Sequence, residues 1–150
     1  MKSLIVVYSY HHNNTEKIAE VIAKVLGCEM KRPKEVNPEE IQEYDLVGFG
    51  SGIYGEKHHK EVLELVDKLP QVNSKKAFVF STSALIDNAT KHKTLKKKLE
   101  PKGYLIVDEF SCKGFNTNSF MRFFGGMNKG RPNEKDLKKA EEFAHSLLRI

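Results

Sequence analysis

The sequence contains little cysteine and has no long apolar run. Its two cysteines, Cys28 and Cys112, stand far apart and form no CxxC pair, which argues against a disulfide framework and a cysteine-based metal site. His58 and His59 are adjacent, so they do not share one face of a helix, and no metal is expected. No apolar stretch approaches the ~20 residues of a membrane span or has the flanks of a signal peptide. We therefore expect a soluble cytoplasmic protein with no membrane partner.

Motifs for nucleic-acid binding and for catalysis are missing as well. Lys and Arg outnumber Asp and Glu by 25 to 20, and the lysines concentrate between residues 91 and 102. A solvated helix face explains such a block more often than a partner does. Because no helix-turn-helix, zinc or RNP pattern accompanies the charge, nucleic-acid binding is not expected. No catalytic dyad or nucleophile motif supplies a substrate acid or base, so no catalytic residue is assigned.

Apolar runs and helical patterns alternate along the 150 residues, which fit one domain, 1–150. The expected strands are 2–8, 28–32, 44–50, 77–80 and 104–110, and the expected helices are 15–26, 38–43, 56–69, 90–100 and a last one after Asn133. The first strand shows no alternation, as expected where both faces of a parallel sheet are covered. Five β-α units in this order predict the α/β class, with a parallel, doubly wound sheet and right-handed crossovers.

The loop after the first strand is expected to bind an anion. It leads into a helix whose unpaired N–H groups and positive dipole end point at whatever lies above the strand. Ser9, Asn14 and Thr15 supply hydroxyl and amide donors. His11 and His12 add donors that can carry charge near neutral pH, so a phosphate would be well bound. The alternative is that Asn14 or Thr15 caps the helix and the histidines are solvated.

Two later loops have the composition of contacts to a planar ligand. The segment Gly50 to Gly55 has glycines around Ile53 and Tyr54, so both side chains can lie over a flat ring while the backbone comes near it. The segment Ser81 to Ala84 is small and rich in hydroxyls, which lets short polar groups approach a ring edge. The alternatives are an ordinary strand-to-helix turn with core side chains in the first case and a generic polar turn in the second.

The first loop carries a resemblance to a known family. Ser9 to Thr15, followed by Glu-Lys-Ile-Ala, resembles the phosphate-binding loop of the flavodoxin family, which usually reads Ser/Thr-x-Thr-Gly-Asn-Thr. Asn14 and Thr15 match its last two positions, and Asn13 stands at the glycine, a mild change because Asn tolerates left-handed backbone angles. His11 and His12 stand where a small hydroxyl residue is usual. The resemblance implies a flavodoxin-like three-layer α/β/α sandwich with a five-stranded parallel sheet in the order 2-1-3-4-5.

The resemblance also implies one noncovalently bound FMN. Its phosphate would lie at the first helix, and its isoalloxazine ring would lie between the second and third loops. The cofactor-binding residues implied in this way are Ser9, His11, His12, Asn13, Asn14, Thr15, Ser51, Gly52, Ile53, Tyr54, Gly55, Thr82, Ser83 and Ala84.

The first functional hypothesis is an FMN-binding electron-transfer protein that works with redox partner proteins. An alternative is an enzyme, either an FMN-dependent NAD(P)H or quinone oxidoreductase or a flavodoxin-domain oxidase. In that case the aromatic segment 111–132 would form a substrate pocket, although its phenylalanines are also suited to covering the sheet or forming a homodimer contact. A second alternative is a cofactor-free binding module of the same fold that uses the lysine-rich face of residues 91–102.

Overall fold

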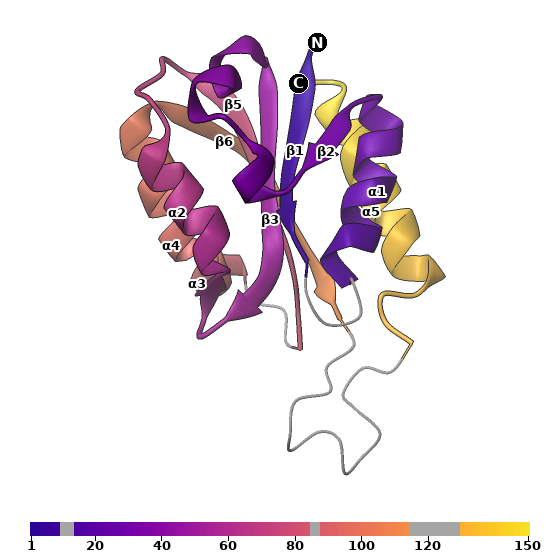
Figure 1. Cartoon of the computed structure of the whole chain (residues 1–150). Helices are drawn as coiled ribbons and strands as arrows, with labels where there is room; N and C mark the ends of the chain where they lie inside the picture. Colours follow the sequence, from indigo (N-terminus) through magenta and orange to yellow (C-terminus); the bar gives the residue numbers. More distant parts are fainter. Residues whose placement is uncertain (10–13, 85–87, 115–129) are drawn as a thin grey trace.

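The computed structural model describes residues 1–9, 14–84, 88–114 and 130–150. Its strands are β1 (Ser3–Tyr8), β2 (Glu29–Lys31), β3 (Leu46–Tyr54), β4 (Lys57–His58), β5 (Lys75–Ser83) and β6 (Tyr104–Lys113). Its α-helices are α1 (Asn14–Leu26), α2 (Lys60–Lys68), α3 (Asn88–Lys91), α4 (Lys93–Leu99) and α5 (Glu134–Leu147), and 3₁₀ turns cover Pro33–Glu35, Pro38–Glu43 and Glu100–Lys102. Helices α1 and α5 lie on one face of the sheet, and α2, α3 and α4 lie on the other (Figure 1).

The sheet has the predicted parallel order. Its strands run β2-β1-β3-β5-β6, and every neighbouring pair along this path is parallel. Numbered as the sequence predicts them, these strands have the order 2-1-3-4-5, so the flavodoxin-like α/β/α arrangement is confirmed. The short β4 is not among the predicted strands. It pairs antiparallel with the end of β3.

Each face of the sheet buries its own apolar cluster. Alternate residues of β1 point to opposite faces, so that Leu4 and Val6 pack toward α2 and α4 whereas Ile5 and Val7 pack toward α1 and α5. Both clusters consist of fully or almost fully buried side chains. Because both faces are buried, the β1 sequence is continuously apolar, as the sequence pattern indicates.

The glycines of β3 make room for the neighbouring strand. A Cβ atom at Gly48 would lie 2.2 Å from the Phe78 ring, and one at Gly50 would lie 2.3 Å from the Phe80 ring. Both phenylalanines are fully buried in the cluster under α1 and α5. These two glycines therefore serve packing between β3 and β5.

The loop predicted at residues 51–55 is largely strand, which is a correction. Strand β3 continues to Tyr54 and turns back into β4 through Gly55 and Glu56, both of which have positive φ angles (57° and 69°). Two central residues with positive φ are the requirement of a tight type I′ hairpin. The helix predicted from residue 56 is consequently wrong in its first turn, because α2 begins only at Lys60.

Two further boundaries differ from the sequence prediction. Strand β5 runs on to Ser83, so most of the predicted polar turn at 81–84 is strand. The helix predicted at 90–100 is divided at His92 into α3 and α4. In both places a polar side chain is buried, Thr82 near the end of β5 and His92 between the two helices.

The pairing of β5 with β6 contains a shift of register. Ala77 pairs with Ile106, but the next residue, Phe78, pairs with Asp108. The extra residue is Val107, as in a β-bulge. Beyond it Glu109 pairs with Val79 and therefore lies on the α2 and α4 face.

No helix within the described residues is long and apolar enough to cross a membrane.

Candidate functional site

The carboxyl ends of β1, β3 and β5 lie side by side, and they bring the described parts of the three predicted loops to one edge of the sheet. Ser51 of β3 pairs in register with Tyr8 of β1 on one side and with Ser81 of β5 on the other. Gly52 pairs in the same way with Thr82. In open parallel sheets this edge, at the strands where the order reverses, is where ligands bind.

The first loop is tied to the third by a hydroxyl pair. Thr15 and Thr82 are both almost fully buried, and their Oγ1 atoms lie 2.7 Å apart. Ser9 Oγ accepts a hydrogen bond of 3.2 Å from the backbone N–H of Glu16, which fixes the chain at the start of α1. The predicted site residues His11, His12 and Asn13 lie outside the described residues.

The end of β6 also reaches this corner. Gly114 N donates to Ser83 O at 3.0 Å, and a Cβ atom at Gly114 would lie only 2.8 Å from the Nδ2 atom of Asn14. Asn14 itself is buried at the first position of α1. The start of α1, the end of β5 and the end of β6 are therefore packed into one corner of the site.

The second predicted loop forms the top of the β3–β4 hairpin. Ser51 Oγ donates to Gly52 O at 2.5 Å and accepts from the backbone N–H of His59 at 2.9 Å. A Cβ atom at Gly52 would lie 3.4 Å from the ring of Tyr54, so this ring lies over the Gly52 backbone. Ile53 and Tyr54 are half-buried, and Gly55 occupies the hairpin turn.

Three rings meet beside this hairpin. Tyr8 and His59 stack with centroids 3.7 Å apart and planes 11° apart, and Tyr54 meets His59 edge-on at 5.0 Å and 80°. His59 Nδ1 accepts from Glu61 N at 3.1 Å, so this side chain is the N-cap of α2. Partial burial lowers the pKa of His59, which keeps Nδ1 free to accept. These half-exposed ring faces are suited to a flat ligand.

A second network lies beneath the same edge on the α2 and α4 face. Ser81 Oγ lies 2.7 Å from His92 Nε2, and His92 Nδ1 lies 2.8 Å from Glu109 Oε1. Lys96 Nζ donates to the other oxygen of Glu109 at 3.0 Å. Because a carboxylate only accepts, Nδ1 of His92 carries the proton and Nε2 accepts from Ser81. His92 lies between the end of α3 and the start of α4, and it is fully buried.

A second buried histidine adjoins this network. The rings of His58 and His92 have centroids 5.1 Å apart, and His58 Nε2 lies 2.9 Å from Phe80 O, to which it donates. No described residue hydrogen-bonds to its Nδ1 atom. Burial lowers the pKa of His58 to about 3 and also lowers the pKa of His92, in spite of the hydrogen bond from His92 to Glu109.

The structure brings the described members of the predicted site together and adds residues that the sequence did not single out. The added residues are Tyr8, His58, His59, His92 and Glu109. Two of them, His58 and His59, could have been indicated only by a hairpin signal at Gly55 and Glu56. A hairpin there would have placed both histidines beside β3.

The lysine-rich segment 91–102 is mostly paired within the chain. The partners are Glu56 for Lys91 (2.6 Å), Glu109 for Lys96 (3.0 Å), Asp67 for Lys98 (2.8 Å), and the carbonyl oxygens of Asp67 and Leu69 for Lys102 (2.8 and 2.7 Å). These lysine pairs favour the interpretation of the segment as a solvated helix face.

Within the described residues no group of three His, Cys, Asp or Glu side chains is arranged to hold a metal ion.

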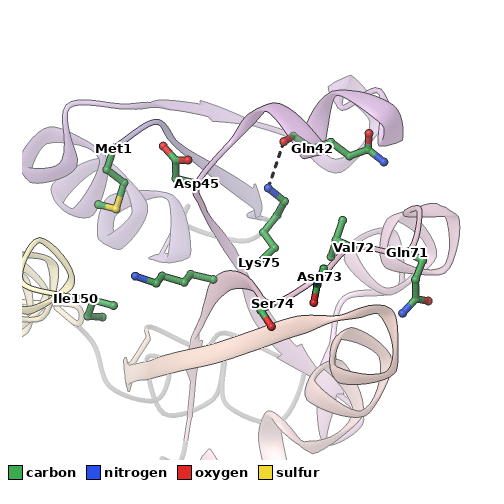
Figure 2. Close-up of a pocket in the computed structure, with 10 residues that line it drawn as sticks. Met1, Gln42, Asp45, Gln71, Val72, Asn73, Ser74, Lys75 and Ile150 are labelled. Atoms are coloured by element: carbon green, nitrogen blue, oxygen red, sulfur yellow. Dashed lines mark hydrogen bonds between the residues drawn. The ribbon is translucent and has the colours of Figure 1, made fainter.

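A pocket of about 660 Å³ lies at the opposite edge, near the amino ends of β1, β3 and β5 (Figure 2). Lys75 from its wall donates to Gln42 O at 3.3 Å and also to Tyr44 O. The ammonium group is thus bonded to carbonyls of the chain itself. None of the described site residues lines this pocket.

The doubly wound sheet and its strand order define a flavodoxin-like α/β protein. A family model described as a flavodoxin domain matches residues 5–125. The chain therefore belongs to the flavodoxin family. It is also 49% identical, over 99% of each chain, to an uncharacterized protein of Methanocaldococcus jannaschii.

Solved structures show the same fold. Oxidised flavodoxin 2 from Bacillus cereus superposes with a TM-score of 0.73 at 21% identity over 99% of each chain. A flavodoxin from the domain Archaea gives 0.71 at 17% identity over 99% of this chain and 97% of the other. Fusobacterium nucleatum flavodoxin bound to flavin mononucleotide gives 0.67 at 14% identity over 99% and 98%.

Proposed function

We propose that this chain binds one FMN noncovalently at the carboxyl edge of β1, β3 and β5 and carries electrons between partner proteins. The observation that supports this most directly is the contact between Thr15 and Thr82. It joins the helix start suited to a phosphate to the strand end suited to a ring edge. The two parts of a nucleotide-sized ligand therefore have adjoining places to bind.

The residues at the edge fit the chemistry of FMN. The start of α1 directs backbone N–H groups toward a phosphate, and Thr15 lies at that start. Gly52 has no side chain to hold a ring away, and the Tyr54 ring beside it offers an aromatic face. Fusobacterium nucleatum flavodoxin, whose structure contains bound flavin mononucleotide, has the same fold.

Bound FMN would supply the redox chemistry, and the protein would set how readily it accepts electrons through stacking, hydrogen bonds and nearby charge. A carrier needs no substrate acid or base. The contact between Ser81 and His92 has the distance of a nucleophile–base pair, but it is buried beneath the edge of the sheet, on the α2 and α4 face. We therefore do not assign this pair to a hydrolytic reaction.

A titration with FMN followed by absorption and flavin fluorescence tests binding. We expect saturable binding to one site. Thr15→Val keeps the shape of the side chain but removes its hydroxyl, and should weaken binding about tenfold, the loss of one hydrogen bond to a charged group. Thr94→Val, on α4 at the other face, is the matched control and should bind normally. A protein that does not bind added FMN would refute the proposal.

Anaerobic reduction of the loaded protein then separates carrier from enzyme. A carrier should be reduced by dithionite and respond slowly to NADH or NADPH alone. Prompt bleaching of the flavin bands by either nicotinamide would contradict the carrier assignment and favour the oxidoreductase.

A further inference from the structure

A series of hydrogen-bonded polar side chains lies under the site and runs from the edge of the sheet toward solvent. It begins at Ser81, which pairs in register with Ser51 of the second loop and directly precedes Thr82 of the third. It continues through His92 to Glu109, whose side chain is 25% exposed, and to Lys96. Ser81, at one end of this series of side chains, is therefore the direct neighbour of Thr82 in the proposed ring site. Glu109 and Lys96, at the other end, are in contact with water.

The geometry leaves His92 able to accept one more proton. In the neutral ring Nδ1–H donates to Glu109 and Nε2 accepts from the Ser81 hydroxyl. A proton added at Nε2 reverses the second bond, because Nε2–H then donates to Ser81 Oγ, an atom that can donate or accept. Both partners thus remain hydrogen-bonded when the ring is charged, so protonation breaks no contact.

Charged groups of both signs lie around His92. Glu109 of β6 favours the charged ring, whereas Lys96 of α4 and the neighbouring His58 of β4 oppose it when they are charged. Lys91 of α3 is paired with Glu56 of the hairpin turn. With burial added, the pKa of His92 lies below its ordinary value. A new negative charge nearby would favour the charged ring.

We propose that His92 takes up a proton from solvent when the bound flavin is reduced, so that the protein carries a proton together with an electron. This inference rests on the proposed function. The electron comes from the reductant and adds to the flavin, the proton adds to His92 Nε2, and the net charge of the site is unchanged. Reoxidation by the partner releases the proton again.

The coupling should appear as an added pH dependence of the midpoint potential. Between the pKa of His92 in the oxidised protein and its higher pKa in the reduced protein, the equilibrium constant for reduction falls up to tenfold per pH unit, or about 59 mV for one electron. His92→Gln cannot take up the proton. Its potential should therefore depend on pH less steeply by up to this amount, whereas His145→Gln, on the exposed surface of α5, should match the wild type.

Two charge variants test the same idea without removing the buried ring. Glu109→Gln removes the charge that favours protonated His92 and should move the steep region to lower pH. Lys96→Gln removes an opposing charge and should move it to higher pH. The proposal requires the two variants to shift the steep region in opposite directions. A merely structural role for these side chains would not give shifts of opposite sign.

A direct measurement follows the ring nitrogens of His92 by NMR in the oxidised and reduced protein. We expect the pKa of His92 to rise on reduction. An unchanged pKa, together with equal slopes for wild type and His92→Gln in FMN-loaded protein, would overturn this inference and leave the proposed function intact. Failure to bind FMN at all would overturn both.

Discussion

Successive residues of β5 connect the site to two different environments. Thr82 points toward α1, where it meets the hydroxyl of Thr15, and Ser81 points toward α3 and α4, where it meets His92. The α1 face thus holds the site with groups that do not ionise near neutral pH. The opposite face holds it with ionisable side chains, among them His58 and His92. The difference indicates that one face fixes geometry, which should be indifferent to pH, and the other sets an electrostatic environment, which should not be.

The largest expected effect tests the ionisable face. His58 has a pKa of about 3 in the folded protein, below its ordinary value of 6.5. As the pH is lowered, the unfolded chain therefore binds this proton before the folded protein does. The contribution of His58 to the free energy of unfolding is complete above pH 6.5 and is lost as the pH falls toward 3. Lowering the pH from 7.5 to 4.5 should cost about 3 kcal/mol through this residue. His58→Gln keeps a donor for Phe80 O and should lack this loss, as urea unfolding of the apoprotein at both pH values would show. Equal losses in both proteins would contradict the assignment.

The next effect tests packing under α1 and α5. In Gly50→Ala the new methyl group would overlap the ring of Phe80, and we expect a loss of about 2 kcal/mol from overpacking. This loss should be the same at pH 7.5 and 4.5. Gly50→Ala combined with Phe80→Leu should be more stable than the sum of the two single changes predicts. Simple additivity would show that the two positions do not compete for space.

The hydroxyl pair between α1 and β5 should have a smaller effect. Thr82→Val leaves the Thr15 hydroxyl buried without its partner and should cost about 1.5 kcal/mol. The double variant Thr15→Val/Thr82→Val should cost little more than either single variant, because the remaining hydroxyl is then removed too. Unfolding of the four proteins completes a double-mutant cycle. A pH-dependent coupling energy would contradict the contrast between the faces.

The smallest effect separates the two roles of His59. His59→Phe keeps a ring to stack on Tyr8 but removes the N-cap of α2, at a cost of about 1 kcal/mol. His59→Asn keeps a capping oxygen and removes the stacking ring. If only the first variant loses stability while only the second loses FMN affinity, the cap and the ring act independently. Equal changes in both variants would show that the stacked ring itself positions α2.

The sequence pattern was sufficient for a parallel, doubly wound sheet and for the start of the site, whereas the strand order came from the resemblance to the flavodoxin family. Continuous apolar runs such as residues 4–7 identify strands covered on both faces, and their alternation with helical patterns leaves few topologies. Asn14 and Thr15 were predictable because a helix that begins directly after such a strand must place its first residues at the carboxyl edge. These inferences depend on local patterns only.

The rest depends on contacts between residues far apart in the chain. Nothing near His92 in the sequence indicates that it meets Ser81 and Glu109, and a helical pattern through 90–100 conceals the break that lets it do so. The hairpin at Gly55 and Glu56 was missed because a glycine followed by a charged residue is equally typical of a helix start. The two histidines after it were therefore not placed against β3.

The bulge in β6 decides which carboxylate meets His92. Side chains alternate between the faces of a strand, so if β6 paired on from Ile106 without a bulge, Asp108 instead of Glu109 would pair with Val79 and face α4. Phe110 and Cys112 would also leave the cluster that they now help to fill. Deletion of Val107 would place Asp108 directly after Ile106, opposite Phe78, and would leave Glu109 paired with Val79, so the same carboxylate would still face α4. The bulge therefore absorbs one surplus residue and keeps the end of β6 in register with both faces.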